Sequence, residues 1–478
     1  MKKDLYPWLL LTVTSLAVLL TGLNLSTLNV ALPAISAHFQ AGAVAASWTI
    51  LSYMLFNTVL ILVFGRLGDI YGRRNLFLFG FAVYTAACFL CGLAANVGVF
   101  ILFRIFQAIG GALVTANTTP LITDAFIRGR LGLALGINAF FVAIAQLIGP
   151  VVGGYLVVVL GWQWIFWLNV PLGILCLVWG WLRLRPEPGR ARGDKIDVKG
   201  NIAAVLGLGG LIYALSEGGV TGWVRAPVLA GILLFAVSAV FFFRHERRVP
   251  SPMIDLTMFN NRCYAMANLA AFLNSYTRAA SLLMVSLYFQ IVAQDNPLEA
   301  GLKTLPIAIG LSLSSPVVGL LSQKYSARFL SIVGLVGTCL GLGLLIWQIR
   351  GEVSVFWISV GGLLVGIGSG VFQTPNTMLI MTTVRAARRG VANGIRSMLQ
   401  NMGKVFGTAL SLLLVTYYLP YHLKNAVYEG TVGVLQPENI DLISQGFQAS
   451  FWIMLFLTVI AIFATYFRVQ DESNPEEV

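Results

Sequence analysis

The chain has 478 residues, of which 58% are hydrophobic and only 10% are charged. A soluble domain carries roughly 25% charged residues, so these few charges could not cover a water-facing surface, and lipid must cover part of it. The net charge of +12 is explained below by membrane topology, and we expect no nucleic-acid partner.

Apolar runs of about 20 residues recur along the whole length, which is typical of membrane-spanning helices. We therefore predict an all-α polytopic membrane protein with fourteen transmembrane helices and no soluble domain. The predicted spans, in chain order, are 8–33, 46–66, 75–96, 99–122, 132–157, 164–183, 199–217, 227–244, 264–292, 301–322, 328–349, 353–378, 390–419 and 448–467. The longest predicted loop is 420–447, and shorter polar links lie at 184–198 and 245–263.

Lysine and arginine are distributed unevenly over the predicted loops, and such residues favour the cytoplasmic side. With a cytoplasmic N-terminus, 24 of the 31 cations lie on the inner side, Arg396 among them. The others are the outer Arg225, Lys303, Arg350 and Lys424, and the three within spans, Arg104, Arg278 and Lys404. This asymmetry predicts a multi-pass protein of the cell (plasma or inner) membrane with both termini in the cytoplasm.

The chain repeats one short segment. "GRLGDIYGRR" occupies 65–74 between the second and third spans, and "GLLSQKYSAR" occupies 319–328 between the tenth and eleventh. Gly, Leu, Tyr and Arg recur at identical offsets, and internal repeats are common in secondary transporters. We predict an N-terminal six-helix bundle (1–185), two linking transmembrane helices (186–262) and a C-terminal six-helix bundle (263–478).

The first copy of the repeat has the residues of a gate. Asp69 lies in a predicted cytoplasmic turn, where its carboxylate can meet helix N-terminal amides and Arg73 or Arg74. Gly65 and Gly72 permit close approach and a tight turn. The alternative is a generic charged loop whose arginines only set the topology.

The fifth span contains "IGPVVGG", residues 148–154. Pro150 removes a backbone hydrogen bond, and Gly149, Gly153 and Gly154 remove side chains from one side. We expect a kinked helix that packs closely on a neighbour.

Several segments together resemble one family. "GRLGDIYGRR" is similar to the signature loop of the major facilitator superfamily, and "RIFQAIGGA" (104–112) resembles its second motif. "IGPVVGG" resembles its fifth-helix antiporter motif. "WQWIFWLNVPLG" (162–173) and "SPMIDLTMFNNR" (251–262) are similar to segments of its fourteen-span drug:proton antiporter branch. The resemblance implies a secondary transporter that works by alternating access, in which Arg104 has a role in coupling or gating.

The first helix departs from that branch. The branch usually has Asp in an L-D-x-T-x-x-N-x-A-x-P pattern, whereas this chain reads "LNLSTLNVALP" (23–33) with Asn24 at that place. An amide can neither bind a proton nor face a cationic drug as a carboxylate does. The partner of Arg104 would then be an amide, a carbonyl or a substrate anion.

Two cations lie deep within predicted spans. Arg278 and Lys404 are each roughly 20 Å along their helices from the inner end, at a rise of about 1.5 Å per residue. Each lies on a polar stripe of helical spacing, which suits a cavity because lipid penalises such groups. The stripes are Asn274, Arg278, Ser281 and Tyr288, and Asn393, Ser397, Gln400, Lys404 and Ser411. The alternative is that both cations bond backbone carbonyls in a packed interface.

The sequence predicts a secondary active transporter that exports amphipathic small molecules or lipids, with anionic, zwitterionic or neutral substrates favoured over cations. Candidate substrate-binding or coupling residues are Asn24, Arg104, Asn274, Arg278, Gln400 and Lys404, with protons as a possible coupling ion and Lys404 as the site that exchanges them. We expect a monomer in the lipid bilayer, without enzymatic activity, metal or cofactor. The alternatives are a cation-type multidrug:proton antiporter, and a receptor or assembly subunit that does not transport.

Overall fold

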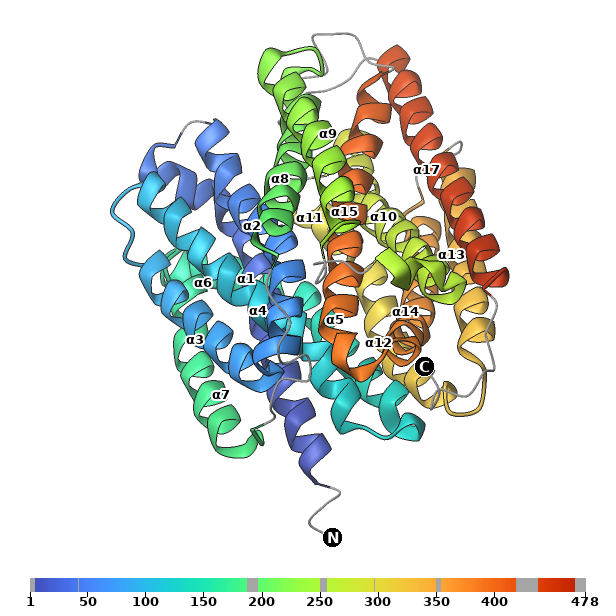
Figure 1. Ribbon diagram of the computed structural model, residues 1–478. Coiled ribbons are helices and arrows are strands. Elements are labelled where there is room, and N and C mark those ends of the chain that lie inside the picture. Colours follow the sequence, from blue (N-terminus) through green and yellow to red (C-terminus); the bar gives the residue numbers. More distant parts are fainter. Residues whose placement is uncertain are drawn as a thin grey trace.

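The computed structural model describes residues 5–41, 43–186, 197–249, 256–295, 297–349, 354–417 and 437–468. Every regular element within these ranges is a helix, and most of the helices run side by side along one direction (Figure 1). The first set is α1 (Tyr6–Phe39), α2 (Ala43–Tyr71), α3 (Arg73–Cys91), α4 (Val97–Ala125), α5 (Arg128–Val159), α6 (Trp164–Trp167) and α7 (Asn169–Arg183). Next come α8 (Val198–Thr221), α9 (Ala226–Glu246) and the 3₁₀ helix η1 (Leu256–Asn260). The last set is α10 (Arg262–Ile291), α11 (Pro297–Lys303), α12 (Leu305–Leu321), α13 (Ala327–Gln348), α14 (Val355–Thr383), η2 (Ala386–Arg388), α15 (Arg389–Tyr417) and α17 (Pro437–Tyr466).

The described part of the chain contains 13 stretches of helix long and apolar enough to cross a membrane. The helix α10 is not among them, although its 30 residues are long enough to span. Its polar residues, with Arg278 near the middle, lower its mean hydropathy. Because α10 packs inside the bundle against α14, α15 and α17, we count it as the fourteenth span. The predicted all-α polytopic fold is confirmed.

Several predicted spans differ from the structure in their bounds, and three differences are the largest. The span at 164–183 consists of two helices, α6 and α7. The span at 301–322 is likewise divided between α11 and α12, with Thr304 between them. The helix α17 begins at Pro437, so the end of the predicted loop 420–447 is helical. The rest of that loop, and the middle of the links at 184–198 and 245–263, lie outside the described residues.

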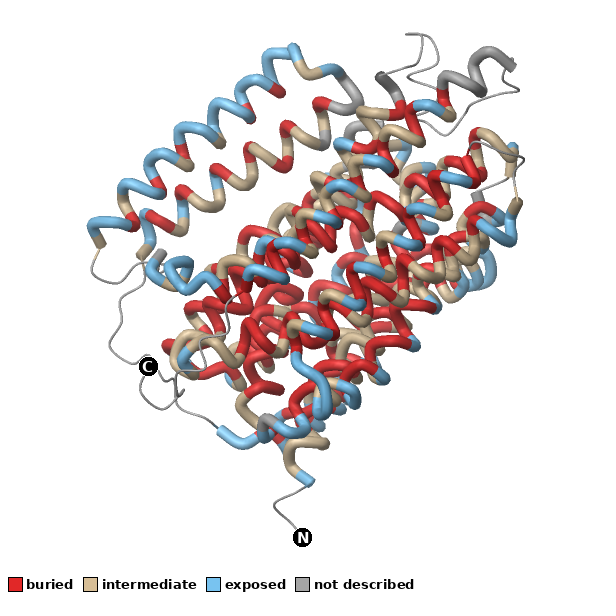
Figure 2. Tube along the Cα trace, turned by 90° about the vertical axis from the view of Figure 1, so that its right-hand side faces the viewer, coloured by how far each residue is buried: buried red, intermediate tan, exposed pale blue. Residues whose placement is uncertain are grey.

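The two linking helices form a pair on the side of the bundle. The helix α8 packs against α2 of the first set and α15 of the last, and α9 packs mainly on α8. Glycines allow the pair to approach closely, because a Cβ on Gly210 would lie 2.6 Å from the carbonyl oxygen of Gly231. Figure 2 shows buried residues concentrated in the middle of the bundle and exposed residues on its outside.

The first and last sets of helices meet mainly through α5 against α12 and α2 against α15. A Cβ on Gly136 would lie 2.5 Å from the carbonyl oxygen of Ser315, and one on Gly65 would lie 2.3 Å from that of Gly390. These contacts involve the beginnings of α5 and α15 and the ends of α2 and α12. The described close contacts between the sets therefore gather at one end of the bundle, which the charge distribution predicts to be cytoplasmic.

Candidate functional site

The carboxylate of Asp69 joins the two sets of helices at that end. Asp69 lies in the last turn of α2 and is only 1% exposed. Its Oδ1 accepts a hydrogen bond from the backbone N–H of Gly390 (3.0 Å), and its Oδ2 accepts one from that of Val391 (3.1 Å). These are the first free amides of α15, where a negative charge is stabilised by unpaired N–H groups and by the helix dipole.

Three more charged residues complete this contact. Arg73 at the start of α3 donates through Nη2 to Asp69 Oδ1 (2.6 Å), and through Nη1 it contacts the carboxylate of Asp124. Arg389 of α15 donates to the other oxygen of Asp124 (2.6 Å). We call these four residues, Asp69, Arg73, Asp124 and Arg389, the latch cluster. Acidic and basic side chains alternate along the cluster, so each charge has a partner of opposite sign, and the pair of Asp124 with Arg389 joins the two sets.

The other members of the predicted gating motif lie around the cluster. Gly72 precedes α3 with φ of 100°, a left-handed conformation that favours glycine. Gly65 makes the close backbone contact with Gly390 described above. Arg74 points elsewhere, because its guanidinium donates to the carbonyl oxygens of Leu184 (2.8 Å) and Trp181 (2.9 Å) at the end of α7. Among the two arginines offered by the sequence, Arg73 is the one that pairs with Asp69.

The proline of the fifth-helix motif leaves a carbonyl that α1 satisfies. Pro150 cannot donate to the oxygen of Gln146, four residues earlier. The hydroxyl of Ser26 on α1 donates to that oxygen at 3.2 Å. Cβ atoms on Gly149 and Gly153 would lie 2.3 Å and 2.9 Å from atoms of Ser26 and Thr27, so both glycines are needed for this approach. Gly154 has more room, with its nearest neighbour 3.9 Å away.

Asn24, Arg104 and Gln107 form a buried polar network in the first set. Asn24 Oδ1 accepts from Arg104 Nη1 (3.0 Å) and from Gln107 Nε2 (3.0 Å). Arg104 Nε donates to the carbonyl oxygen of Thr49 (3.2 Å), and Nη1 also contacts Gln107. The partners of Arg104 are thus amide and carbonyl oxygens, two of the three kinds that the sequence left open.

In the last set, the cations Arg278 and Lys404 lie on neighbouring helices. Cβ atoms on Gly403 and Gly407 of α15 would each lie 2.5 Å from a carbonyl oxygen of α10, at Phe272 and at Tyr276. This parallel register brings the turn that carries Lys404 beside the turn that carries Arg278. Lys404 also lies within electrostatic range of Arg278.

The contacts of these two cations differ from those expected of an interface in which both bond backbone carbonyls. Lys404 Nζ donates to the side-chain oxygen of Asn401 (3.1 Å) rather than to a backbone carbonyl oxygen. Arg278 Nε is buried and has no acceptor among the described residues. Both residues are nevertheless partly exposed, although each lies near the middle of a long helix. Such a position is costly in lipid but not beside a water-filled cavity.

Arg396 is a site residue that the sequence analysis missed. Counting charges placed it on the inner side, whereas it lies two turns inside α15 and is 7% exposed. Its guanidinium donates to the side-chain oxygens of Asn393 (2.7 Å) and Gln400 (3.1 Å). Its position four residues before Gln400 on the same polar stripe was the signal that could have identified it.

Asn393 connects this stripe to the first set of helices. Pro120 within α4 leaves the carbonyl of Ala116 without its helical donor. Asn393 Nδ2 donates to that oxygen at 2.9 Å and to the oxygen of Thr115 at 3.0 Å. A side chain of one set thereby satisfies a backbone group that proline frees in the other.

Part of the predicted polar stripe of α10 does not face α15, where Lys404 lies beside Arg278. Ser281 donates to the sulfur of Met454 on α17 (3.4 Å), and Tyr288 is buried in an apolar cluster that includes Phe447. The expectation that both would line the cavity is wrong, because this part of α10 packs against α17. Asn274 is 4% exposed, and its Oδ1 has no partner among the described residues.

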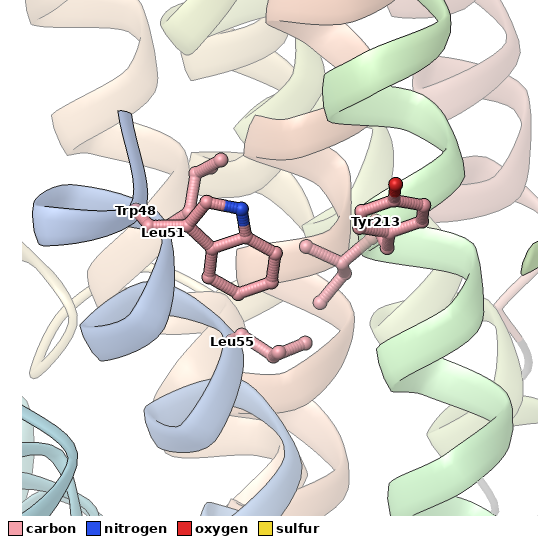
Figure 3. A pocket seen from close by; sticks show the side chains of 5 residues that line it. Trp48, Leu51, Leu55 and Tyr213 are labelled. Carbon is pink, nitrogen blue, oxygen red and sulfur yellow. The ribbon is translucent and has the colours of Figure 1, made fainter. Parts of the chain in front are cut away.

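A small pocket lies away from these groups, between α2 and α8 (Figure 3). Its walls are apolar and aromatic: Trp48, Leu51, Leu55, Ile212 and Tyr213. The rings of Trp48 and Tyr213 have centroids 6.1 Å apart. None of these five residues belongs to α10 or α15. In the described part of the chain, no group of three or more His, Cys, Asp or Glu residues could hold a metal ion.

Comparison with known proteins agrees with this architecture. The family model of the Major Facilitator Superfamily matches residues 14–245 and 267–478. Multidrug resistance protein Stp of Mycobacterium tuberculosis is 32% identical over 424 residues, which are 88% of this chain and 78% of the relative. Multidrug resistance protein 3 of Bacillus subtilis is 29% identical over 84% of this chain and 79% of the relative.

Among solved structures, the proton:xylose symporter XylE superposes with a TM-score of 0.67 at 15% identity, covering 98% of this chain and 97% of the other. At this identity the likeness concerns the fold alone. The sequence matches span nearly the whole chain and agree with the internal repeat, the signature loop and the fourteen helices. The chain therefore belongs to the major facilitator superfamily, in its drug-efflux branch, whose members are membrane transporters.

Proposed function

We propose that the protein is an exporter that works by alternating access and favours anionic, zwitterionic or neutral amphipathic molecules, including lipids, over cations. The observation that carries this proposal is the position of Arg278 and Lys404 side by side near the middle of α10 and α15. Among the described residues, the carboxylates lie near helix ends, so these two charges have no acidic neighbour at their own depth.

The size of the electrostatic effect is enough to select substrates. Two unit charges 6 Å apart interact by about 3 kcal/mol at an effective dielectric constant of 20, and about 1.4 kcal/mol changes an equilibrium tenfold. One of these cations would therefore disfavour a bound cation, or favour a bound anion, by about a hundredfold. A neutral amphiphile pays no such penalty and remains a substrate. The guanidinium of Arg278 suits a carboxylate or phosphate because its planar donors match their geometry.

The contacts between the two sets of helices support alternating access. The latch cluster and the glycine contacts hold one end closed, and we propose that this end is cytoplasmic and that the membrane is the cell membrane. Opening would separate Asp69 from the first amides of α15 and Asn393 from α4. The two predicted six-helix bundles would then rock about the region of Arg278 and Lys404, with α8 and α9 as the link.

Lys404 is our candidate for proton coupling, since Asn24 cannot exchange a proton. In an empty cavity, Arg278 repels the ammonium group and favours release of its proton. A bound anion removes that repulsion, and Lys404 takes the proton up again. The substrate anion and the proton would thereby favour each other's binding at one electrostatic site.

Flux in proteoliposomes tests the proposal. Cationic, neutral and anionic amphiphiles of one alkyl chain length should be compared under imposed pH and voltage gradients. We expect flux of the anionic and neutral compounds that exceeds that of the cation. Equal or faster transport of the cation would support a cation-type multidrug:proton antiporter instead. Binding without flux of any compound would support a receptor or assembly subunit.

A further inference from the structure

The positive charge of Arg104 has no anionic partner in the part of the chain that the structure describes. Its side chain is 0% exposed, and its hydrogen-bond partners are the neutral oxygens of Thr49, Asn24 and Gln107. The titratable groups within electrostatic range of it are two tyrosines and two thiols, which are uncharged at neutral pH. These are Tyr53, Tyr84, Cys88 and Cys91. A buried charge without a partner of opposite sign is costly.

Two N–H groups of the same network also lack acceptors among the described residues. They are Nη2 of Arg104 and Nδ2 of Asn24, both fully buried. The orientation of the Asn24 amide is fixed, because its Oδ1 accepts from both Arg104 and Gln107. Turning the amide over would set its NH₂ group against those two donors. The network therefore offers donors and positive charge, and it needs an acceptor with negative charge.

The surroundings limit the size of that acceptor. The ring of Tyr53 covers the guanidinium at 4.6 Å, and the ring of Phe166 lies 5.9 Å from the guanidinium carbon. Guanidinium donors lie in the plane of the group, so the acceptor must approach at the Nη2 edge. Arg104 and Asn24 are 0% and 1% exposed, so the protein would enclose the acceptor, which favours a small one.

We propose that Arg104 and Asn24 bind a small monovalent inorganic anion, of which chloride is the most abundant. The anion accepts hydrogen bonds from Nη2 of Arg104 and Nδ2 of Asn24 and balances the charge of the guanidinium. An aspartate at position 24 would supply this negative charge from within the chain. Because Asn24 is neutral, a bound anion must supply it instead. This site lies in the first set of helices, apart from Arg278 and Lys404, so it is independent of the proposed substrate site.

The test is the thermal stability of the purified protein as chloride replaces gluconate at constant ionic strength. We expect a saturable rise in the unfolding temperature, because a ligand that binds only the folded state stabilises it. Bromide and nitrate should act like chloride, whereas gluconate, which is too large, should not. An unfolding temperature that does not change with any of these anions would overturn the proposal.

Variants assign the effect to the site. Asn24→Asp supplies a carboxylate beside Arg104, so its unfolding temperature in gluconate should rise and its chloride dependence should disappear. Arg104→Gln should lose the chloride dependence, but its unfolding temperature in gluconate should not rise. Asn138→Asp is the matched control, since it adds an acid to a half-buried amide position of α5 and should retain the dependence. Undiminished chloride dependence in Asn24→Asp or Arg104→Gln would place the anion elsewhere and refute the assignment. If Arg104→Gln does not fold, Asn24→Asp decides alone.

Discussion

Replacing Asp69 by Asn should destabilise the closed state at the end of the bundle that carries the latch cluster, which we call the latch end, without exposing apolar surface. The carboxylate accepts from Arg73 and from the amides of Gly390 and Val391, whereas an asparagine offers one oxygen for these donors. Hydrogen bonds to charged groups contribute about 1.5–3 kcal/mol each. We expect the closed state to lose about 2–4 kcal/mol relative to the open one, which is about 30- to 700-fold in their ratio.

Spin labels can measure this change. Tyr71 and Tyr325 are 60% and 50% exposed and lie at the latch end of α2 and just beyond α12, one in each set. In a background whose five cysteines are replaced, the distance between labels at these positions should shift towards longer values in Asp69→Asn. Transport should slow, because the closed intermediate of the cycle becomes rare.

The matched control is Asp295→Asn. Asp295 also pairs with a cation, since its Oδ2 lies 2.5 Å from Lys303 Nζ, but it lies beyond the other end of α10. Its removal should leave the distances between Tyr71 and Tyr325 unchanged. If Asp69→Asn shows the distances and turnover of the unmodified protein, the latch cluster does not hold the closed state, and the reasoning is wrong.

Two further predictions follow from single contacts, and a third follows from the predicted topology. Ser26→Ala should lower the free energy of unfolding by roughly 1 kcal/mol, because the carbonyl that Pro150 frees loses its donor; unfolding in mixed detergents measures this. Asn393→Ala should destabilise the closed state of the latch end by about 2 kcal/mol. The distance between labels at positions 71 and 325 should then lengthen as in Asp69→Asn, and an unchanged distance would contradict the role of Asn393 in joining the two sets of helices. Membrane-impermeant labels should reach a cysteine at 192 only from the cytoplasmic side and one at 428 only from outside; labelling of both from one side would contradict the fourteen-span topology.

The fold could be predicted largely from the sequence because membrane spans are determined locally. A run of apolar residues with the right length specifies a helix that lipid can surround, whatever its neighbours are. The helix α10 shows the limit of that rule, since its polar stripe makes its hydropathy too low. The sequence nevertheless predicts this segment as the span 264–292, because its length is right and most of its residues are apolar.

The partners within the site could not be predicted, because they depend on contacts between distant segments. The sequence indicates that Pro150 frees a carbonyl, but it does not identify Ser26, more than 100 residues away, as the donor. It offers two arginines beside Asp69, and only the positions of α3 and α7 decide that Arg73 makes the pair. Arg396 was misplaced because it was counted with the inner loop although it lies within the predicted span 390–419; the observed helix α15 begins at Arg389, close to that prediction.

We propose that Arg278 and Lys404 select substrates by charge. The decisive measurement is the affinity for an anionic amphiphile and for its neutral analogue. It is made on the unmodified protein, on Arg278→Gln and Lys404→Gln, and on Lys303→Gln as the control. We predict that each of the first two variants weakens anion binding by up to about a hundredfold and changes neutral binding little, and that Lys404→Gln also removes the pH dependence of transport. If both variants bind and carry the anion normally, with normal pH dependence, the two cations are structural and the account is wrong.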